Sequence, residues 1–469
     1  MNYKFKTKPY DHQITALEKS WDKKEYAYFM EMGTGKSKVL VDNIAMLYDK
    51  GKINAALIIA PKGVYRNWFS GEIPNHLASH IDHKTVLWTA TTSKTKDKEY
   101  QQLFKVDIDL HILVMNVEAF STKKGLEFAT RFLNCHNTLM AIDESTTIKT
   151  PTAKRTKAIL ALGLLAKYRR ILTGSPVTKS PLDLYTQCGF LDSFLLGFDS
   201  YYAFRNRYAT MLDRNFGGRR VQIVGGYKKL GELSDKLKNF SYRVLKEDCL
   251  DLPPKTYVTR QVDLTMEQER HYQSIKKTSV AFLESGDMVT APEVMTRLLR
   301  LQQLLCGYLV TDDGEVKHIP NNRLTVLLEV IEEMEGKVII WSRFRHDIMK
   351  ICSSLKGVYG QDSTVTYFGD TSMADRDEAI ARFQDPSDPT RFFISNAQTG
   401  GMGITLHAAT NVIYYSNDFN LESRVQSEDR AHRVGQHNTV LYVDLVCPNT
   451  VDVHIVKTLV NKNKLTNIT

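Results

Sequence analysis

The sequence predicts an α/β fold of two lobes, each a parallel sheet flanked by helices, with helical insertions between the lobes. Short apolar runs rich in β-branched residues recur along the chain, and stretches of helical pattern separate them. These runs do not alternate with polar residues, which indicates strands covered on both faces, and strands that alternate with helices are typical of βαβ units. The expected strands are residues 55–60, 112–115, 139–142 and 171–172 in the first half and 338–341, 365–368, 392–394, 412–415 and 440–446 in the second.

The composition is that of an ordinary globular protein. Of the 469 residues, 42% are hydrophobic and 25% are charged, which excludes a disordered chain and a disulfide-stapled miniprotein. No apolar run approaches the roughly 18 residues that span a bilayer, and the first residues lack the apolar stretch of a secretory signal. The six cysteines are scattered without a CxxC pair. We therefore expect a cytoplasmic protein with no zinc site or disulfide framework.

The charge balance is basic. Lysine and arginine number 62 against 53 acids, which gives a formal net charge of +9 and an isoelectric point near 9.0. Such a balance permits nucleic-acid binding but does not establish it.

The middle of the chain has a different pattern from the two ends. From about residue 191 to 303 it is mostly helical in pattern, but two Gly-Gly pairs flank a β-prone run at 219–224, which suggests a hairpin. Pro253 and Pro254 predict a hinge or linker, because consecutive prolines stop helices and stiffen the chain. We expect a first lobe at 1–190, a mainly helical segment and linker at 191–320 with the hairpin at 215–227, and a second lobe at 321–469.

A glycine-rich loop lies between an aromatic strand-like run and a helical run. Gly33 and Gly35 allow the backbone to wrap around phosphates at a helix N-terminus, where Lys36 would reach the β- and γ-phosphates and Ser37 would hold Mg²⁺. The strict phosphate-loop pattern has glycine where this chain has Met30, so the match is partial. The alternative is a glycine-rich turn with a solvated lysine.

Two acidic residues follow an apolar strand downstream of this loop. Parallel strands present their carboxyl ends to a ligand crevice, so Asp143 would coordinate Mg²⁺ and Glu144 would polarise the attacking water. An acidic pair on a solvated strand end is the alternative. The combination with the glycine-rich loop favours a nucleoside triphosphatase.

Two arginines near the C-terminal end share one predicted helix face. Arg430 and Arg433 are three residues apart and would point together into a cleft, where two guanidinium groups stabilise charge on a γ-phosphate. A surface helix of mixed charge would have a similar composition. Earlier in the sequence, the glycine-rich loop with Gly400, Gly401 and Gly403 follows the strand at 392–394 and could pass close to a phosphate backbone or the nucleotide.

Taken together and in order, these motifs resemble the SNF2 (Swi2/Snf2) family of superfamily 2 helicase-like ATPases over nearly the whole chain. The first half resembles the adenine-reading Q motif in YDHQ, motif I in EMGTGKS, motif Ia in LIIAPKGVYRNW, motif II in IDES and motif III in ILTGSPVTKSPLDLY. The second half resembles motif IV in KVIIWSRFRHD, motif V in SNAQTGGMGITL and motif VI in DRAHRVGQ, which is the most specific.

The resemblance implies two RecA-like lobes that clamp ATP with Mg²⁺. It assigns Lys36, Asp143, Glu144, Arg430 and Arg433 to catalysis, Ser37 and Asp143 to Mg²⁺, and Gln13, Gly33, Thr34, Gly35, Lys36, Ser37, Gly403 and Gln426 to the nucleotide. It also implies nucleic-acid contacts at Lys62, Asn67, Trp68, Thr173, Ser175, Arg343, Thr399, Gly400 and Gly401.

Two motifs depart from the family pattern. In motif II, Ser145 and Thr146 replace the usual last two residues, so the link from motif II to motif III that a histidine would make is expected through Thr146 or elsewhere. In motif V, Ala397 and Thr399 differ from the usual small polar residues. Neither departure removes a residue that hydrolysis requires.

We expect an ATP-driven motor that moves along duplex DNA without sequence preference, since phosphate contacts carry no sequence information. The compact layout and a faint resemblance to the fork-remodelling branch suggest forks or Holliday junctions, with Arg219 and Arg220 of the hairpin at a strand junction. The compact layout also suits a bacterial or viral source. We expect no obligate protein partner and no association with a membrane. The alternatives are an RNA helicase of the same superfamily and a non-motor clamp on DNA that ATP switches.

Overall fold

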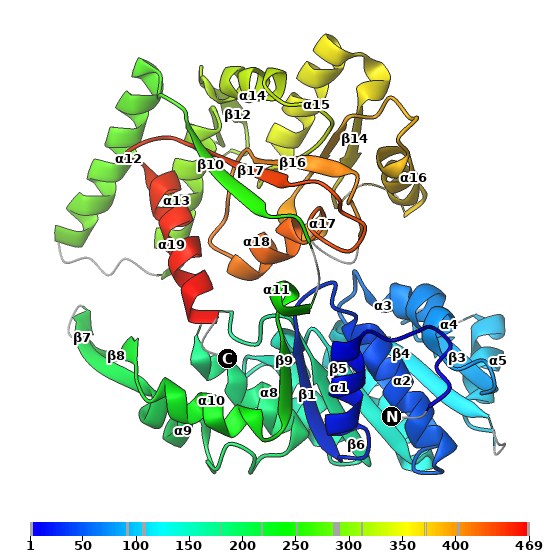
Figure 1. The fold of residues 1–469 in the computed structure, drawn as a ribbon. Coiled ribbons are helices and arrows are strands. Elements are labelled where there is room, and N and C mark those ends of the chain that lie inside the picture. The colour runs from blue at the N-terminus through cyan, green and yellow to red at the C-terminus, as the bar shows by residue number, and fades with distance from the viewer. Residues whose placement is uncertain are drawn as a thin grey trace. The chain divides into compact units, whose positions relative to one another are not determined.

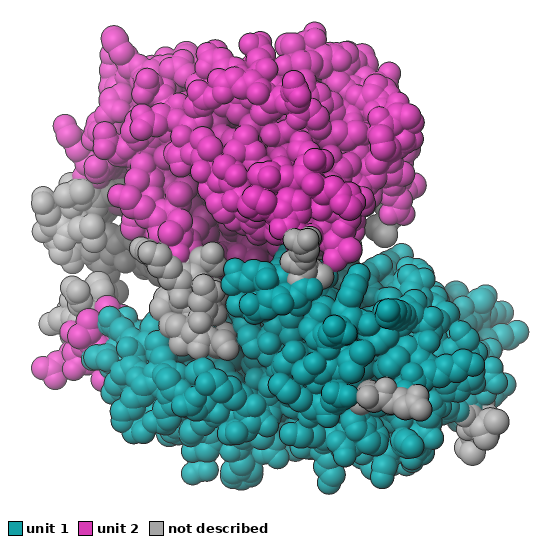
Figure 2. Space-filling model, in the orientation of Figure 1, with its two compact units in different colours: residues 1–211, 224–251, 464–469 teal, residues 212–223, 252–463 magenta. Residues whose placement is uncertain are grey.

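A computed structural model of the chain divides into two compact units. Unit 1 comprises residues 1–211, 224–251 and 464–469, and unit 2 comprises residues 212–223 and 252–463 (Figure 2). The structure describes residues 3–90, 93–105, 109–178, 180–216, 219–249, 252–284, 291–310, 313–369, 371, 373–400 and 404–466.

Unit 1 is built on a seven-stranded sheet in the order β3-β4-β2-β5-β6-β1-β9 (Figure 1). Every pairing is parallel, so all seven strands end at the same edge. The strands are β1 (Glu25–Met30), β2 (Ala55–Ala60), β3 (His83–Leu87), β4 (Leu110–Asn116), β5 (Thr138–Asp143), β6 (Tyr168–Leu172) and β9 (Ser241–Val244).

Both faces of this sheet are covered. Within β2, Leu57 and Ile59 belong to one apolar cluster, whereas Ala56 and Ile58 belong to the other, because successive side chains point to opposite faces. This explains why the strands read as continuous apolar runs. The covering helices are α1 (Asp11–Ser20), α2 (Lys36–Asp49), α3 (Tyr65–Asn67), α4 (Ile73–His76), α5 (Lys94–Gln102), α6 (Lys123–Cys135), α7 (Lys154–Gly163), α8 (Leu184–Leu191), α9 (Tyr201–Tyr208), α10 (Leu230–Lys238) and α11 (Lys246–Cys249).

Unit 2 repeats the design with a six-stranded parallel sheet in the order β10-β17-β16-β13-β15-β14. In β13, Val338 and Ile340 pack into one cluster, and Ile339 and Trp341 into another. The strands are β10 (Lys255–Gln261), β13 (Lys337–Trp341), β14 (Thr364–Tyr367), β15 (Phe392–Ser395), β16 (Ala409–Tyr414) and β17 (Val440–Val446). The helices are α12 (Met266–Glu284), α13 (Ala291–Leu305), α14 (Arg323–Glu332), α15 (Arg345–Tyr359), α16 (Met373–Gln384), α17 (Ala397–Gly400), α18 (Leu421–Glu428) and α19 (Val451–Thr466).

The predicted fold class is confirmed, and each strand predicted from an apolar run is present to within a few residues. The helical pattern of the middle segment is confirmed by α9, α10, α12 and α13, and the hairpin by the pairing of β7 (Ala209–Phe216) with β8 (Arg219–Tyr227). A second small pair joins β11 (Tyr308–Val310) to β12 (Val316–His318).

The division of the chain differs from the predicted boundaries. The segment 191–320 is not a unit of its own, because β9 completes the sheet of unit 1 and β10 completes the sheet of unit 2. β9 has only four residues, and β10 directly follows Pro253 and Pro254. Neither strand was therefore recognised within a segment of helical pattern. Among the residues that the structure describes, no helix is long and apolar enough to cross a membrane.

Candidate functional site

The glycine-rich loop connects the end of β1 to the start of α2. Gly33 and Gly35 both have a φ of 84°, in the left-handed region that glycine adopts without strain. A Cβ at Gly35 would lie 2.1 Å from Gln13 Nε2, so the loop also needs glycine there for space. Met30 is the buried last residue of β1, an extended position that needs no glycine. The departure from the strict pattern therefore leaves the turn intact.

The Q motif on α1 holds the loop through one carbonyl. Gln13 Nε2 donates to the Thr34 carbonyl oxygen at 3.0 Å, and His12 Nε2 lies 2.8 Å from the same oxygen. The Thr34 hydroxyl turns back to the Glu31 carbonyl oxygen at 2.7 Å. The loop conformation is thus fixed by side chains of α1 and by its own hydrogen bonds. Sequence reasoning assigned Gln13 to the nucleotide but missed His12.

Lys36 is the first residue of α2 and lies near the end of β5, which carries Asp143. Both side chains are buried, at 8% and 6% exposure. Burial raises the pKa of Asp143, while the positive charge of Lys36, an indole N–H and a backbone N–H act in the opposite direction. Ser37 follows Lys36 and is half-buried. The predicted phosphate lysine and the predicted Mg²⁺ carboxylate are therefore neighbours in one unit.

Trp68 supplies the indole that holds Asp143. Its Nε1 donates to Asp143 Oδ2 at 2.9 Å, and Glu144 N donates to Asp143 Oδ1 at 3.0 Å. Trp68 begins a π-helical turn (Trp68–Glu72), a feature that is frequent at functional sites. Its side chain is 0% exposed, so the prediction that Trp68 contacts nucleic acid is wrong: the indole faces the carboxylate.

The other predicted contacts in motif Ia lie on the surface. Lys62 and Asn67 are exposed. Asn67 Nδ2 donates to Glu72 Oε1 at 3.2 Å, which fixes its amide at the start of the same turn.

Glu144 has a strained backbone next to Asp143. Its φ of 49° and ψ of 62° are left-handed, a conformation that costs about 1–3 kcal/mol outside glycine and that clusters at functional sites. Thr173 Oγ1 donates to Glu144 Oε2 at 3.4 Å and accepts from Ser175 N at 3.2 Å. Thr173 is 1% exposed, so its predicted nucleic-acid contact is wrong, while Ser175 is half-buried. Motif III therefore meets motif II at its carboxylate.

A second link between motifs II and III replaces the one that a histidine would make. Ser145 Oγ donates to Gln187 Oε1 at 2.7 Å, and Gln187 Nε2 donates to the carbonyl oxygen of Pro176 at 2.8 Å. A link therefore runs through Ser145 and Gln187 of α8, and Thr146 is buried beside Ser145. No motif contains Gln187, and the sequence offered no signal for it.

Motif III also packs against the phosphate loop. A Cβ at Gly174 would lie 3.2 Å from Met32 N. Arg243 on β9 donates from Nη1 to the Gly174 carbonyl oxygen at 3.0 Å, and burial lowers the pKa of this guanidinium against the opposite effect of Glu31. Arg243 was not predicted, because β9 lies in the segment expected to be helical.

In unit 2, the two arginines of motif VI converge on one carbonyl. Arg430 Nη1 and Arg433 Nη1 donate to the Ile404 carbonyl oxygen at 2.9 and 3.3 Å. Arg430 Nε also donates to the carbonyl oxygen of Gln426 at 3.0 Å. The prediction that both share a helix face is wrong, because α18 ends at Glu428 and turns follow it. They are brought together by a shared acceptor instead.

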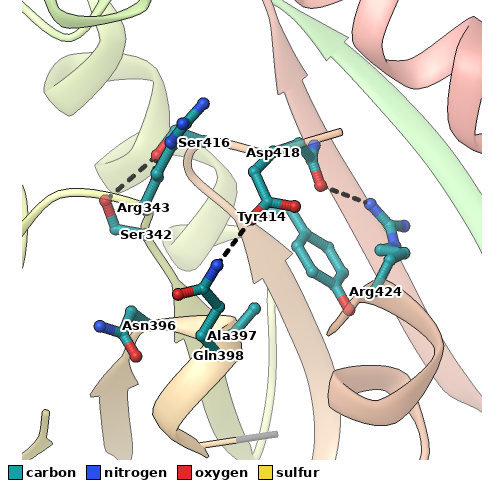
Figure 3. Close-up of a pocket in the computed structure, with 10 residues that line it drawn as sticks. Ser342, Arg343, Asn396, Ala397, Gln398, Tyr414, Ser416, Asp418 and Arg424 are labelled. Carbon is teal, nitrogen blue, oxygen red and sulfur yellow. Dashed lines mark hydrogen bonds between the residues drawn. The ribbon is translucent and has the colours of Figure 1, made fainter. Parts of the chain in front are cut away.

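Motifs IV and V line a pocket of about 180 Å³ at the carboxyl ends of β13, β15 and β16 (Figure 3). Arg343, predicted from motif IV, is one of the residues that line it, and its backbone N donates to Ser416 Oγ at 2.9 Å. Its guanidinium donates to Gln302 Oε1, and burial lowers its pKa. Gln398 Nε2 reaches Asp418 Oδ2 at 3.5 Å.

Several predicted residues stand apart from these sites. Thr399 and Gly400 end α17, whereas Gly401 and Gly403 lie outside the described residues. On β8, Arg220 is exposed, and the side chain of Arg219 lies outside the description. Gln426 contributes its carbonyl to Arg430 as described above.

Comparison with known proteins identifies two family matches that together span most of the chain. Residues 25–308 match the SNF2-related domain, and residues 322–435 match the helicase conserved C-terminal domain. The chain is 23% identical over 477 residues to the CHD3-type chromatin-remodeling factor CHR7 of Arabidopsis thaliana, covering 96% of this chain and 36% of the relative. It is 24% identical over 443 residues to the uncharacterized ATP-dependent helicase MG018 of Mycoplasma genitalium, covering 93% of this chain and 39% of the relative.

Two further likenesses are of the same kind. The human SWI/SNF-related matrix-associated actin-dependent regulator of chromatin subfamily A member 1 is 25% identical, with 93% of this chain and 41% of the relative covered. The Sulfolobus solfataricus SWI2/SNF2 ATPase core in complex with dsDNA is 23% identical with a TM-score of 0.45, covering 99% of this chain and 93% of that one. The chain spans about two fifths or less of the length of these curated relatives. It belongs to the SNF2-related family of helicase-like enzymes.

Proposed function

We propose that this protein is an ATP-driven translocase on duplex DNA that remodels branched DNA such as forks and Holliday junctions. The observation that carries the proposal is the joined set of motifs in unit 1, where Lys36 neighbours Asp143 and Glu144 meets Thr173. A loop, a lysine and two carboxylates in this relation are the parts that hydrolysis of a nucleoside triphosphate requires.

The residues of the loop fit ATP with Mg²⁺. Gly33 and Gly35 adopt the left-handed backbone conformation that a loop wrapped around phosphate oxygens needs, and Lys36 supplies the positive charge. Ser37 and Asp143 are the hydroxyl and carboxylate that would hold Mg²⁺, which when bound supplies charge that neutralises the phosphates. The raised pKa of the buried Asp143 falls when a cation lies beside it.

Glu144 and the motif VI arginines divide the chemical step. Glu144 accepts a proton from the attacking water. Thr173 of motif III donates a hydrogen bond to the same carboxylate, so this bond changes when the carboxylate gains the proton. Arg430 and Arg433 stabilise the charge that develops on the γ-phosphate. The Ile404 carbonyl holds both guanidinium groups side by side, so they act as a pair.

The nucleic-acid track follows the surface residues of motifs Ia, IV and V. Lys62 and Asn67 are exposed in unit 1, and Arg343 lines the pocket of unit 2. Contacts of this kind grip phosphates, so binding is independent of sequence and weakens steeply as salt rises. The names of relatives support DNA as the track, among them a probable ATP-dependent DNA helicase of Arabidopsis thaliana.

The preference for branched DNA rests on the hairpin β7–β8. It is a two-stranded sheet separate from both lobe sheets, and Arg220 is exposed on it. A basic ribbon of this kind suits a strand junction, where two duplex arms separate.

The test is ATP hydrolysis measured with linear duplex, fork and four-way junction DNA, with single-stranded DNA and RNA alongside. Product strands are resolved on a gel in the same reactions. We expect duplex DNA to stimulate turnover, branched DNA to stimulate it most, and the stimulation to fall as salt rises.

Three other results would each change the proposal. Stimulation by RNA alone makes the protein an RNA helicase. One ATP bound per protein with no repeated turnover makes it a clamp. Equal stimulation by linear and branched duplex retains the translocase and removes the junction specificity.

A further inference from the structure

The first residues of unit 2 are fastened to motif VI. Unit 2 resumes at Leu252, immediately followed by Pro253 and Pro254, and β10 then pairs along β17 from Lys255 opposite Val440 (Figure 1). Consecutive prolines resist bending, so a displacement at the junction of the units passes along this segment with little loss.

Three residues of this segment contact motif VI or Glu428, the residue that precedes it. The Pro253 carbonyl oxygen lies 2.8 Å from His432 Nε2. Lys255 Nζ lies 3.3 Å from Glu428 Oε2 and 3.7 Å from Asp429 Oδ1. Tyr257 donates its hydroxyl to Glu428 Oε2 at 2.7 Å while its ring stacks on Tyr442.

Glu428 accepts contacts from both Lys255 and Tyr257. Burial would raise the pKa of its carboxyl, but Arg424, Lys255 and the hydroxyl of Tyr257 outweigh burial and lower it, so the group is a carboxylate. Arg424 Nε donates to its other oxygen, Oε1, at 2.8 Å. Glu428 is 8% exposed, and its carboxylate accepts hydrogen bonds from Lys255, Tyr257 and Arg424, so its side chain is held in place.

The backbone of Glu428 connects its held side chain to the segment that contains the arginines. Its carbonyl oxygen accepts from His432 N at 3.2 Å, and α18 ends at this residue. Arg430 and Arg433 lie in the turns that follow, and their guanidinium groups share the Ile404 carbonyl. A shift of Glu428 therefore moves the segment that presents both arginines.

We propose that Lys255 and Tyr257 are positioning residues that hold the motif VI arginines through Glu428 and couple the junction of the units to ATP hydrolysis. The inference rests on the proposed function, since it assumes that the arginines act on the γ-phosphate and that DNA stimulates turnover. It adds a way for DNA binding to change the hydrolysis rate, through the segment of chain that connects unit 1 to β10.

The test compares Tyr257→Phe and Lys255→Ala with the unaltered protein and with Arg260→Ala. Tyr257→Phe keeps the ring on Tyr442 and removes only the hydroxyl. Arg260 is also on β10 but pairs with Glu333 in an exposed ion pair away from motif VI, so it is the matched control. Each protein is assayed for kcat and KM for ATP, with and without duplex DNA, and for its thermal unfolding midpoint.

We expect Tyr257→Phe and Lys255→Ala to lower the DNA-stimulated kcat by about three- to tenfold, which is less than the full effect of losing one hydrogen bond to a charged group because these residues act on the arginines only through Glu428. The ratio of stimulated to basal rate falls with it, KM for ATP stays within about twofold, and Lys255→Arg recovers most of the loss. Arg260→Ala retains the unaltered ratio.

The proposal is overturned if both variants keep the unaltered ratio, or if stimulated and basal rates fall in the same proportion together with the unfolding midpoint, since that pattern reports a structural role alone. An unaltered protein that hydrolyses ATP with no response to DNA contradicts the proposed function instead. The two failures are thus distinguishable.

Discussion

The two halves of the candidate machinery are held in different ways. In unit 1, side chains of one motif hold side chains of another: Trp68 holds Asp143, Thr173 meets Glu144, and Gln187 links Ser145 to motif III. In unit 2, backbone carbonyls hold the arginines, as Ile404 does for both. Their segment is then tied to the first residues after the junction.

Because of this difference, the carboxylates and the arginines depend on their surroundings in two different ways. The carboxylates of unit 1 have a geometry that is complete within that unit, so substitutions there change the chemical step directly. The arginines of unit 2 depend on the position of a segment that other contacts hold, so, under the proposal, the chemistry that they supply should respond to what happens at the junction. Substitutions at the charged groups themselves and at their supports should therefore give distinguishable losses.

The largest effect is expected at the carboxylate that meets motif III. Glu144→Gln should lower turnover by about 10²- to 10⁴-fold, because the amide cannot accept the proton of the attacking water. ATP binding should stay largely intact, since Lys36 and the loop are unchanged. Steady-state hydrolysis and equilibrium binding of a fluorescent nucleotide measure the two effects. Glu118→Gln changes an exposed glutamate of the same unit and serves as control. Full activity of Glu144→Gln would remove this residue from the base role.

A smaller loss is expected at the more exposed arginine of unit 2. Arg433→Ala should lower kcat by about 10²- to 10³-fold, the usual effect of removing one electrostatic donor from a transition state. Arg433→Lys should recover only part of it, because an ammonium lacks the planar fork of the guanidinium.

The matched control for this variant is Arg376→Ala. Arg376 is also half-buried in unit 2 and also donates to backbone carbonyls, those of Phe368 and Gly369. Turnover of Arg433→Ala equal to that of Arg376→Ala would show that the motif VI arginine does not act on the phosphate.

Much of the fold could be predicted because parallel strands buried on both faces leave a direct trace in the sequence. The runs at 55–60 and 338–341 are apolar at every strand position that faces a cluster. β9 and β10 could not be predicted in this way. β10 is an edge strand that is mostly exposed, and β9 has only four residues, so neither reads as an apolar run.

The site residues whose type is dictated by phosphate or metal chemistry could be predicted. The residues that hold them in place through tertiary contacts were harder to predict. Gly33, Gly35, Lys36 and Asp143 follow from phosphate and metal chemistry, and the structure brings Lys36 and Asp143 together. The roles of Trp68 and Thr173 could not be predicted, because motif spacing does not tell whether a side chain faces solvent or a buried carboxylate. Gln187 and Glu428 act through tertiary contacts that no local pattern contains.

The smallest of these effects should appear at the indole that supports Asp143. Trp68→Phe keeps an aromatic ring in the core and removes the N–H that donates to Asp143 Oδ2. This donor lowers the pKa of Asp143 against the opposing effect of burial, so its loss raises that pKa further. A higher pKa means that the carboxylate is protonated earlier as the pH falls.

Trp68→Phe should therefore lower kcat at neutral pH by about three- to tenfold, and the acid limb of its pH–rate profile should lie at higher pH than that of the unaltered protein. The deficit should shrink as the pH rises, because the carboxylate then forms in both proteins. Trp88→Phe makes the same change at a buried tryptophan in the other apolar cluster of unit 1 and should leave the profile unmoved. Coincident acid limbs for Trp68→Phe and the unaltered protein would mean that the indole fills space in the core without tuning Asp143. A displaced limb would show that motif Ia acts on the nucleotide chemistry from inside the unit.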